Sequence, residues 1–150
     1  MPVKAVPEGF HTLTPYLTVD NASALVDFLK QAFDAKEHDV HRAPDGTVRH
    51  ADLTIGDSHV MVGQAGGPSQ PMHAMIYMYV ENADAKYRQA LSAGATSISE
   101  MTTQFYGDRH GAVRDCCGNQ WWIATHVEDV APAELQRRAE QSMKERQQAT

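Results

Sequence analysis

The pattern of apolar and polar residues in the first half of the chain predicts a strand, a helix and three further strands. Residues 14–19 alternate and are rich in β-branched and aromatic side chains, as in a strand. Asn21 caps a predicted helix over 22–33, because an Asn side chain accepts hydrogen bonds from the free N–H groups of a first turn. The apolar face of this helix is formed by Ala22, Leu25, Val26, Leu29 and Phe33. Further strands are predicted over 36–43, 48–55 and 58–63.

The same order of elements is predicted again in the second half. A strand over 75–80 precedes a helix that Asn82 caps and Gly94 ends. The remaining strands are predicted over 96–103, 112–115 and 120–125, with a turn region at 105–111. Asn21 and Asn82 therefore hold equivalent positions in two β-α-β-β-β repeats.

This repeat predicts an α+β fold in which two βαβββ modules share one core. We expect an extended arm at 1–9 and a main domain at 10–126, with a helical tail at 127–150. Within the domain, the Gly- and Pro-rich linker 64–71 joins modules 10–63 and 72–126. A module this short buries little apolar area alone, so the two modules are expected to pair their sheets and share a cavity.

Composition and charge exclude several classes of partner. The formal net charge of the 150 residues is −6, whereas phosphate binding needs a basic face, so no nucleic-acid partner is expected. No apolar run approaches the roughly 20 residues of a membrane helix, and the N-terminal residues do not resemble a signal peptide. Cys116 and Cys117 are adjacent, which is a poor geometry for an intrachain disulfide. These features predict a cytoplasmic protein without a membrane partner.

Four stretches together resemble the vicinal oxygen chelate superfamily, which includes glyoxalase I, bleomycin resistance proteins and extradiol dioxygenases, and within it the PhnB-like branch. They are "TPYLTVDNASALVDFLKQAF", "RHADLTIGDSHVMV", "QFYGDRHGAVRD" with "GNQWWIATH", and "VEDVAPAEL". The resemblance implies that curled mixed sheets form a cup with the helices outside. It also implies a homodimer and a small-molecule ligand.

The resemblance further implies four metal-ligand positions, which fall here on Thr14, Met61, Met75 and Trp122. Hard and borderline divalent ions prefer carboxylate oxygen or imidazole nitrogen. A hydroxyl, two thioethers and an indole do not supply such ligands. We therefore assign no metal-ligand set and expect no cofactor, although a divalent metal elsewhere stays possible.

Period-two alternation then predicts which side chains line the cup. The expected ligand-binding residues on the strands are Thr14, Tyr16, Met61, Met75, Tyr77, Tyr79, Gln120 and Trp122. Trp121 points the other way and is expected beneath the helices. An aromatic, thioether-rich lining suits an organic ligand, although the same residues could instead fill a core without a cavity.

Two polar features add candidate chemistry. His50, Asp52 and His59 fall on the cup face of the 48–63 hairpin, where they could act as an acid–base group, hold a metal off the usual site, or form a solvated rim. Arg109 is expected at the pocket edge, where it would bind a carboxylate or phosphonate, or else pair with Asp108 or Asp115.

The leading hypothesis is a small-molecule binding protein of the glyoxalase/bleomycin-resistance type. The alternative is a lyase or isomerase that uses a relocated metal or acid–base site at His50, Asp52 and His59. The sequence does not identify the ligand.

Overall fold

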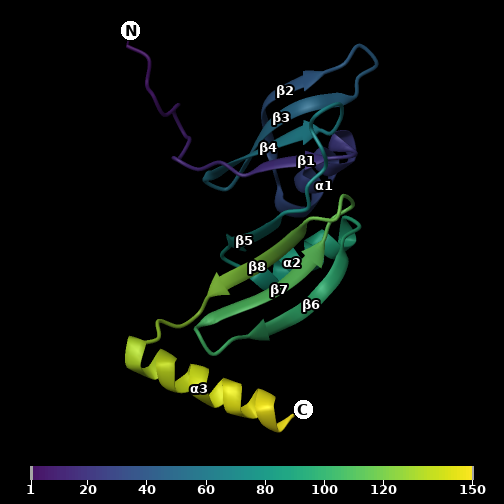
Figure 1. The fold of residues 1–150 in the computed structure, drawn as a ribbon. Coiled ribbons are helices and arrows are strands. Elements are labelled where there is room, and N and C mark those ends of the chain that lie inside the picture. Colours follow the sequence, from purple (N-terminus) through teal and green to yellow (C-terminus); the bar gives the residue numbers. More distant parts are fainter. Residues whose placement is uncertain (1, 150) are drawn as a thin grey trace.

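Two four-stranded mixed sheets, each covered on one side by a helix, form the body of the protein (Figure 1). The structure is a computed structural model and describes residues 2–149. The first sheet has the order β1-β4-β3-β2, with β1 (Tyr16–Val19), β2 (Lys36–Arg42), β3 (Val48–Ile55) and β4 (Ser58–Gln64). Helix α1 (Ala22–Phe33) connects β1 to β2.

The second sheet repeats this arrangement. Its order is β5-β8-β7-β6, with β5 (Met75–Tyr79), β6 (Thr96–Thr103), β7 (Asp108–Arg114) and β8 (Gln120–His126). Helix α2 (Ala83–Ser92) connects β5 to β6. In both sheets the first strand pairs in parallel with the last, and the other pairings are antiparallel. The predicted α+β fold with two βαβββ repeats is confirmed.

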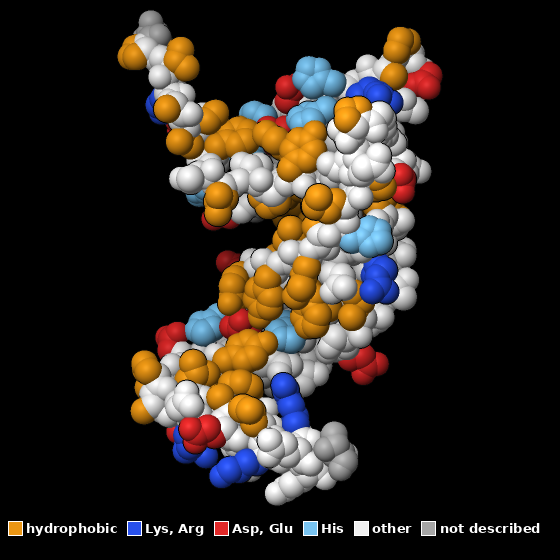
Figure 2. Space-filling view, viewed as in Figure 1, with side chains coloured by type: hydrophobic (Ala, Val, Ile, Leu, Met, Phe, Trp, Pro, Cys, Tyr) orange, Lys and Arg blue, Asp and Glu red, His pale blue; other side chains and the backbone are white. Residues whose placement is uncertain are grey.

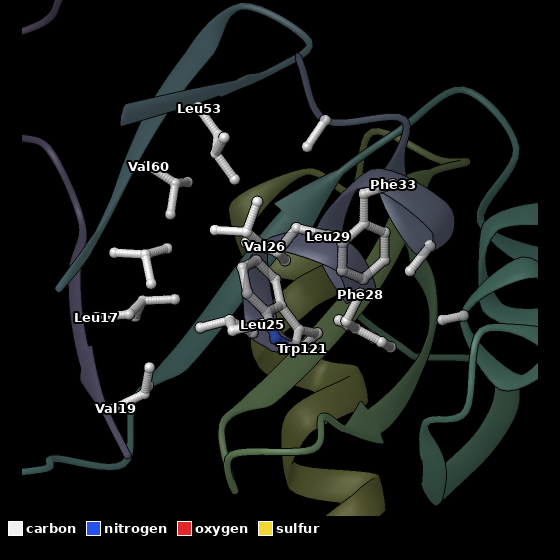
Figure 3. Packing of buried hydrophobic residues seen from close by; sticks show 14 of the residues in the cluster. Leu17, Val19, Leu25, Val26, Phe28, Leu29, Phe33, Leu53, Val60 and Trp121 are labelled. Carbon is white, nitrogen blue, oxygen red and sulfur yellow. The ribbon is translucent and has the colours of Figure 1, made fainter. Parts of the chain in front are cut away.

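Helix α1 lies at the centre of the hydrophobic core. Asn21 caps it as predicted, because its side chain accepts a hydrogen bond from the Ala24 N–H at 3.1 Å. The expected apolar face is buried, and Phe28 and Ala32 are buried as well. Trp121 from β8 reaches this helix, with its ring centroid 5.1 Å from that of Phe33 (Figure 3). The core is therefore shared between the two halves of the chain.

The two helices also contact each other and so join the two halves of the chain. Gln89 of α2 donates hydrogen bonds to the Gln31 carbonyl at 2.8 Å and to Asp34 at 3.2 Å, and Lys86 pairs with Asp34. Each sheet therefore turns one face toward the helices, and we call the opposite face its outer face. The two sheets stay separate and do not close into one cup within the chain.

The tail contains a helix, as predicted, and this helix begins at Pro132. This helix, α3 (Pro132–Gln148), has no buried residue and is held to the body mainly by Arg138. The Arg138 guanidinium pairs with both carboxylate oxygens of Glu128, at 2.7 and 2.9 Å, and donates to the Phe105 carbonyl at 3.0 Å. No helix of residues 2–149 is long and apolar enough to cross a membrane.

The sequence prediction is wrong at residues 105–111, which we expected to form a turn region. The turn is shorter and ends at Gly107, whose φ of 97° is in the left-handed region. Strand β7 already begins at Asp108 and so includes His110. The side chains of Asp108 and His110 are buried in this strand, where Asp108 is hydrogen-bonded to Tyr77 and His110 to Tyr106.

Candidate functional site

The outer face of the first sheet holds the three residues expected to form an acid–base group. Strand register places Asp52 opposite Met61, and Met61 opposite Tyr16. The His59 Nδ1 atom lies 2.8 Å from the Asp52 Oδ1 atom, and both side chains are buried. His50 is placed separately, with its ring 5.7 Å from that of Tyr16. The structure therefore joins two of the three residues.

Gly9 of the N-terminal arm and Phe10, which follows it, cover this pair. The Phe10 ring stacks on His59 with 3.7 Å between centroids and 18° between planes. Gly9 lies beside the Nε2 atom of His59, because a Cβ at Gly9 would be 3.4 Å from it. Since Nδ1 is engaged by Asp52, Nε2 is the nitrogen available for proton exchange with a ligand.

A cavity of about 480 Å³ lies between this sheet and the free edge of β5. Thr14 and His59 line it from the first half of the chain, and Tyr77 and Tyr79 line it from β5. The space-filling view shows a hollow between the two halves, with apolar side chains gathered along the second sheet (Figure 2). Four of the predicted site residues therefore meet at one cavity.

The outer face of the second sheet is aromatic, as the alternation predicted. Register pairs Met75 with Gln120 and Tyr77 with Trp122, and Tyr79 follows on the same face. Met75 is 62% exposed, Tyr77 39% and Tyr79 63%. The indole N–H of Trp122 donates to Gln120 Oε1 at 3.1 Å. Trp121, by contrast, is buried on the helix side, where its N–H donates to Asp115 at 2.8 Å.

Four residues of this face were missed in the sequence. Asp108 is buried and accepts hydrogen bonds from the Tyr77 and Tyr79 hydroxyls, at 2.7 and 2.8 Å, on a single oxygen. Its other oxygen lies 2.9 Å from Nδ1 of His126, whose Nε2 lies 2.7 Å from Asp129. The missed residues are Asp108, His110, His126 and Tyr106.

The hydrogen bonds around Asp108 shift several pKa values. Burial alone would raise the pKa of Asp108, but its three hydrogen-bond donors outweigh that effect and lower it. Burial, and then the hydrogen bond to Asp108, raise the pKa of Tyr77. The pKa of Tyr79 is raised chiefly by the same carboxylate. Hydrogen bonds to Asp108 and then to Asp129 raise the pKa of His126. The cluster is thus an anionic carboxylate held by two neutral phenols and an imidazole.

His110 lies beside this cluster and is incompletely paired. Its Nε2 atom is 2.6 Å from the Tyr106 hydroxyl, and its ring meets the Trp122 ring edge-on at 5.3 Å. Its Nδ1 atom is buried without a hydrogen-bond partner. The alternation of Asp108, His110 and Ala112 is the sequence signal for this face, but Gly107 and Gly111 on either side favoured a turn.

Arg109 lies on the helix side of the second sheet and not at the pocket edge where we expected it. Its guanidinium makes two hydrogen bonds of 2.9 Å to the Asp84 carboxylate in α2. This partner differs from both carboxylates that the sequence suggested. The pairing lowers the pKa of Asp84 and raises that of Arg109. Arg109 therefore fixes the helix to the sheet.

The four positions where the fold implies a metal do not fit one in this chain. Thr14 and Met61 belong to the first half of the chain, and Met75 and Trp122 belong to the second sheet. Their side chains offer no carboxylate or imidazole to a divalent ion. Within residues 2–149 no three His, Cys, Asp or Glu side chains are arranged to hold a metal.

Comparison with known proteins places this chain in a family. Residues 9–123 match the model of the Glyoxalase/Bleomycin resistance protein/Dioxygenase superfamily. The chain belongs to this superfamily. Uncharacterized proteins of Mycobacterium bovis and Mycobacterium tuberculosis are 36% identical to it over 135 residues, which cover 83% of this chain and 89% and 79% of theirs.

Solved structures of other proteins have a similar fold. TioX from Micromonospora sp. ML1 is 26% identical, with a TM-score of 0.69, and the match covers 78% of this chain and 99% of TioX. A PhnB protein from Bacillus cereus has a TM-score of 0.61 at 16% identity over 77% of this chain and 99% of that one, which shows the fold alone.

Proposed function

We propose that this protein binds an organic small molecule against the outer face of its second sheet, without a metal. The observation that carries the proposal is the exposure of Met75, Tyr77 and Tyr79 side by side, next to the half-buried Trp122. Contiguous exposed apolar residues mark a binding surface more often than an idle one. Aromatic faces bind planar ligands by stacking, and the adjoining 480 Å³ cavity is of a size that suits such ligands.

We further propose that the protein is a homodimer of the PhnB-like branch and works in the cytoplasm. The outer face of the second sheet is exposed in the single chain, so a second copy can cover it and enclose the ligand. The only two cysteines of the sequence are adjacent, which is a poor geometry for an intrachain disulfide, and this supports a reducing compartment.

The second candidate is a lyase or isomerase that uses the Asp52–His59 pair. The favouring observation is the buried 2.8 Å contact, because a carboxylate that orients an imidazole is a common arrangement for acid–base catalysis. His59 Nε2 would take or give the proton, and the N-terminal arm would have to leave it to admit a substrate.

A ligand screen by thermal shift, read against two matched variants, tests the leading proposal. A ligand that binds the native state raises the melting temperature. We expect the shift caused by a hit to be lost in Trp122→Ala and reduced in Met75→Ala. Met72→Ala changes a methionine of similar exposure outside the face and should leave the shift intact.

Two results would count against the leading proposal. One is a set of hits whose shifts survive Trp122→Ala, and the other is a screen in which no compound shifts the native protein. Compounds whose thermal shift is lost in His59→Asn but kept in Trp122→Ala would favour the acid–base candidate instead.

A further inference from the structure

The buried Asp108 carboxylate determines which hydrogen-bonding groups the exposed aromatic face can offer to a ligand. The Tyr77 and Tyr79 hydroxyls converge on one of its oxygens, at 2.7 and 2.8 Å. An ionised carboxylate only accepts hydrogen bonds, so both phenols must donate their single proton to it. Each phenol oxygen therefore has only lone pairs left to offer to a ligand. At these two residues the face accepts hydrogen bonds and has no phenol proton to donate.

The rings themselves add to this preference. Tyr77 and Tyr79 are in edge contact, with 5.4 Å between their centroids, and much of each side chain is exposed. An aromatic face carries negative charge density and attracts cations. The Asp108 charge lies directly behind both hydroxyls and is largely shielded from water, so its field at the face is weakly screened.

The charged groups nearby do not cancel that field. Asp57 borders the 480 Å³ cavity, and none of the described residues in its lining is Lys or Arg. His126 contacts Asp108 but is itself shared with Asp129. Arg114 lies on the same face at the other end of β7, about 20 Å away along the strand. Arg109 points to the helix side and is paired with Asp84.

We propose that Tyr77, Tyr79 and Asp108 form a subsite for an organic cation that carries N–H donors, such as a protonated amine, amidine or guanidine. This inference rests on the proposed function, because it names the ligand class of the same face. The cationic group sits against the two phenols, donates to their oxygens and stacks on their rings. The planar or apolar body of the ligand lies along the face toward Trp122.

Three probes of one shape and different charge test this subsite. Naphthylmethylammonium, naphthylmethanol and naphthoate share an aromatic body and differ in charge, and calorimetry measures their affinities. We expect the cation to bind about tenfold more tightly than the alcohol, and the anion to bind more weakly than either. Asp108→Asn should abolish the preference for the cation. Asp84→Asn makes the same charge change on the helix side of the sheet and should preserve it.

A second variant tests the same subsite in case Asp108→Asn does not fold. Tyr79→Phe removes one acceptor from a side chain that is 63% exposed and leaves Asp108 with donors from Tyr77 and His126, so the protein should still fold, with a modestly lower melting temperature, while the cation preference falls severalfold. Equal binding of all three probes, lost in Trp122→Ala, would overturn the cation subsite and leave the proposed function standing. A tenfold preference that persists in Asp108→Asn would also overturn it. Failure of all three probes to bind would contradict both.

Discussion

Replacement of each of the two adjacent tryptophans should separate packing from binding. Trp121 is 1% exposed, packs against Phe33 and donates to the buried Asp115. Removal of a fully buried Trp side chain costs about 3–5 kcal/mol of unfolding free energy. The cost of the lost hydrogen bond is included in that range, because Asp115 still accepts hydrogen bonds from the Cys117 N–H and the Asn119 N–H.

The expected magnitudes for the tryptophan variants follow from these contacts. Trp121→Ala should lose about 4 kcal/mol, a large fraction of the 5–15 kcal/mol typical of a domain, and this variant risks unfolding. Trp121→Phe keeps a ring but loses the N–H, so about 2 kcal/mol is expected. Trp122→Ala, on the half-buried outer face, should lose about 1 kcal/mol.

Urea titration followed by circular dichroism measures all three tryptophan variants. The midpoint should fall in the order of the predicted losses while the m-value stays constant, since m reports the surface exposed on unfolding. The facing of the two side chains would be refuted if Trp122→Ala destabilised the protein as much as Trp121→Ala.

Two further predictions concern the residues around Asp108. His126 has a raised pKa through its bonds to Asp108 and Asp129, so its stabilising effect is full below its ordinary pKa and is lost as pH rises through the raised value. When the pH is raised from 5 to 9, the urea midpoint of the native protein should fall. The fall should be smaller in His126→Gln, and equal falls in the two proteins would refute this role of His126. Gly107→Ala should cost at least about 1 kcal/mol, because φ is 97° and the new Cβ would collide with the Glu128 carbonyl. An unchanged melting temperature would contradict that collision.

Much of the fold was predictable because it depends on local signals. Asn21 and Asn82 mark both helix starts with a side-chain cap, and the two strand alternations around the 56–57 turn fix the first hairpin. Period-two alternation put Trp121 and Trp122 on opposite faces, and the family resemblance indicated that Trp122 is the one on the cup face. The same rule placed Tyr77 and Tyr79 on one face before any tertiary contact was known.

The rest depends on contacts between distant segments. Asp108 looked like a turn residue because two glycines bracket it, and only its partners from β5 and β8 explain its burial in a strand. Arg109 found its carboxylate in α2, far along the sequence. The stacking of Phe10 on His59 depends on the path of an arm that has no regular structure of its own.

The central claim is that the outer face of the second sheet binds an organic ligand, and the two indole N–H signals test it most directly. The chain has two tryptophans, so a ¹⁵N-resolved NMR titration with a screening hit reads both faces of β8 at once. Trp121 borders the cavity but is 1% exposed and its N–H is held on Asp115, so we predict that the Trp122 signal shifts saturably with ligand while the Trp121 signal shifts much less. A saturating ligand that leaves Trp122 unmoved, or moves Trp121 alone, would contradict the account.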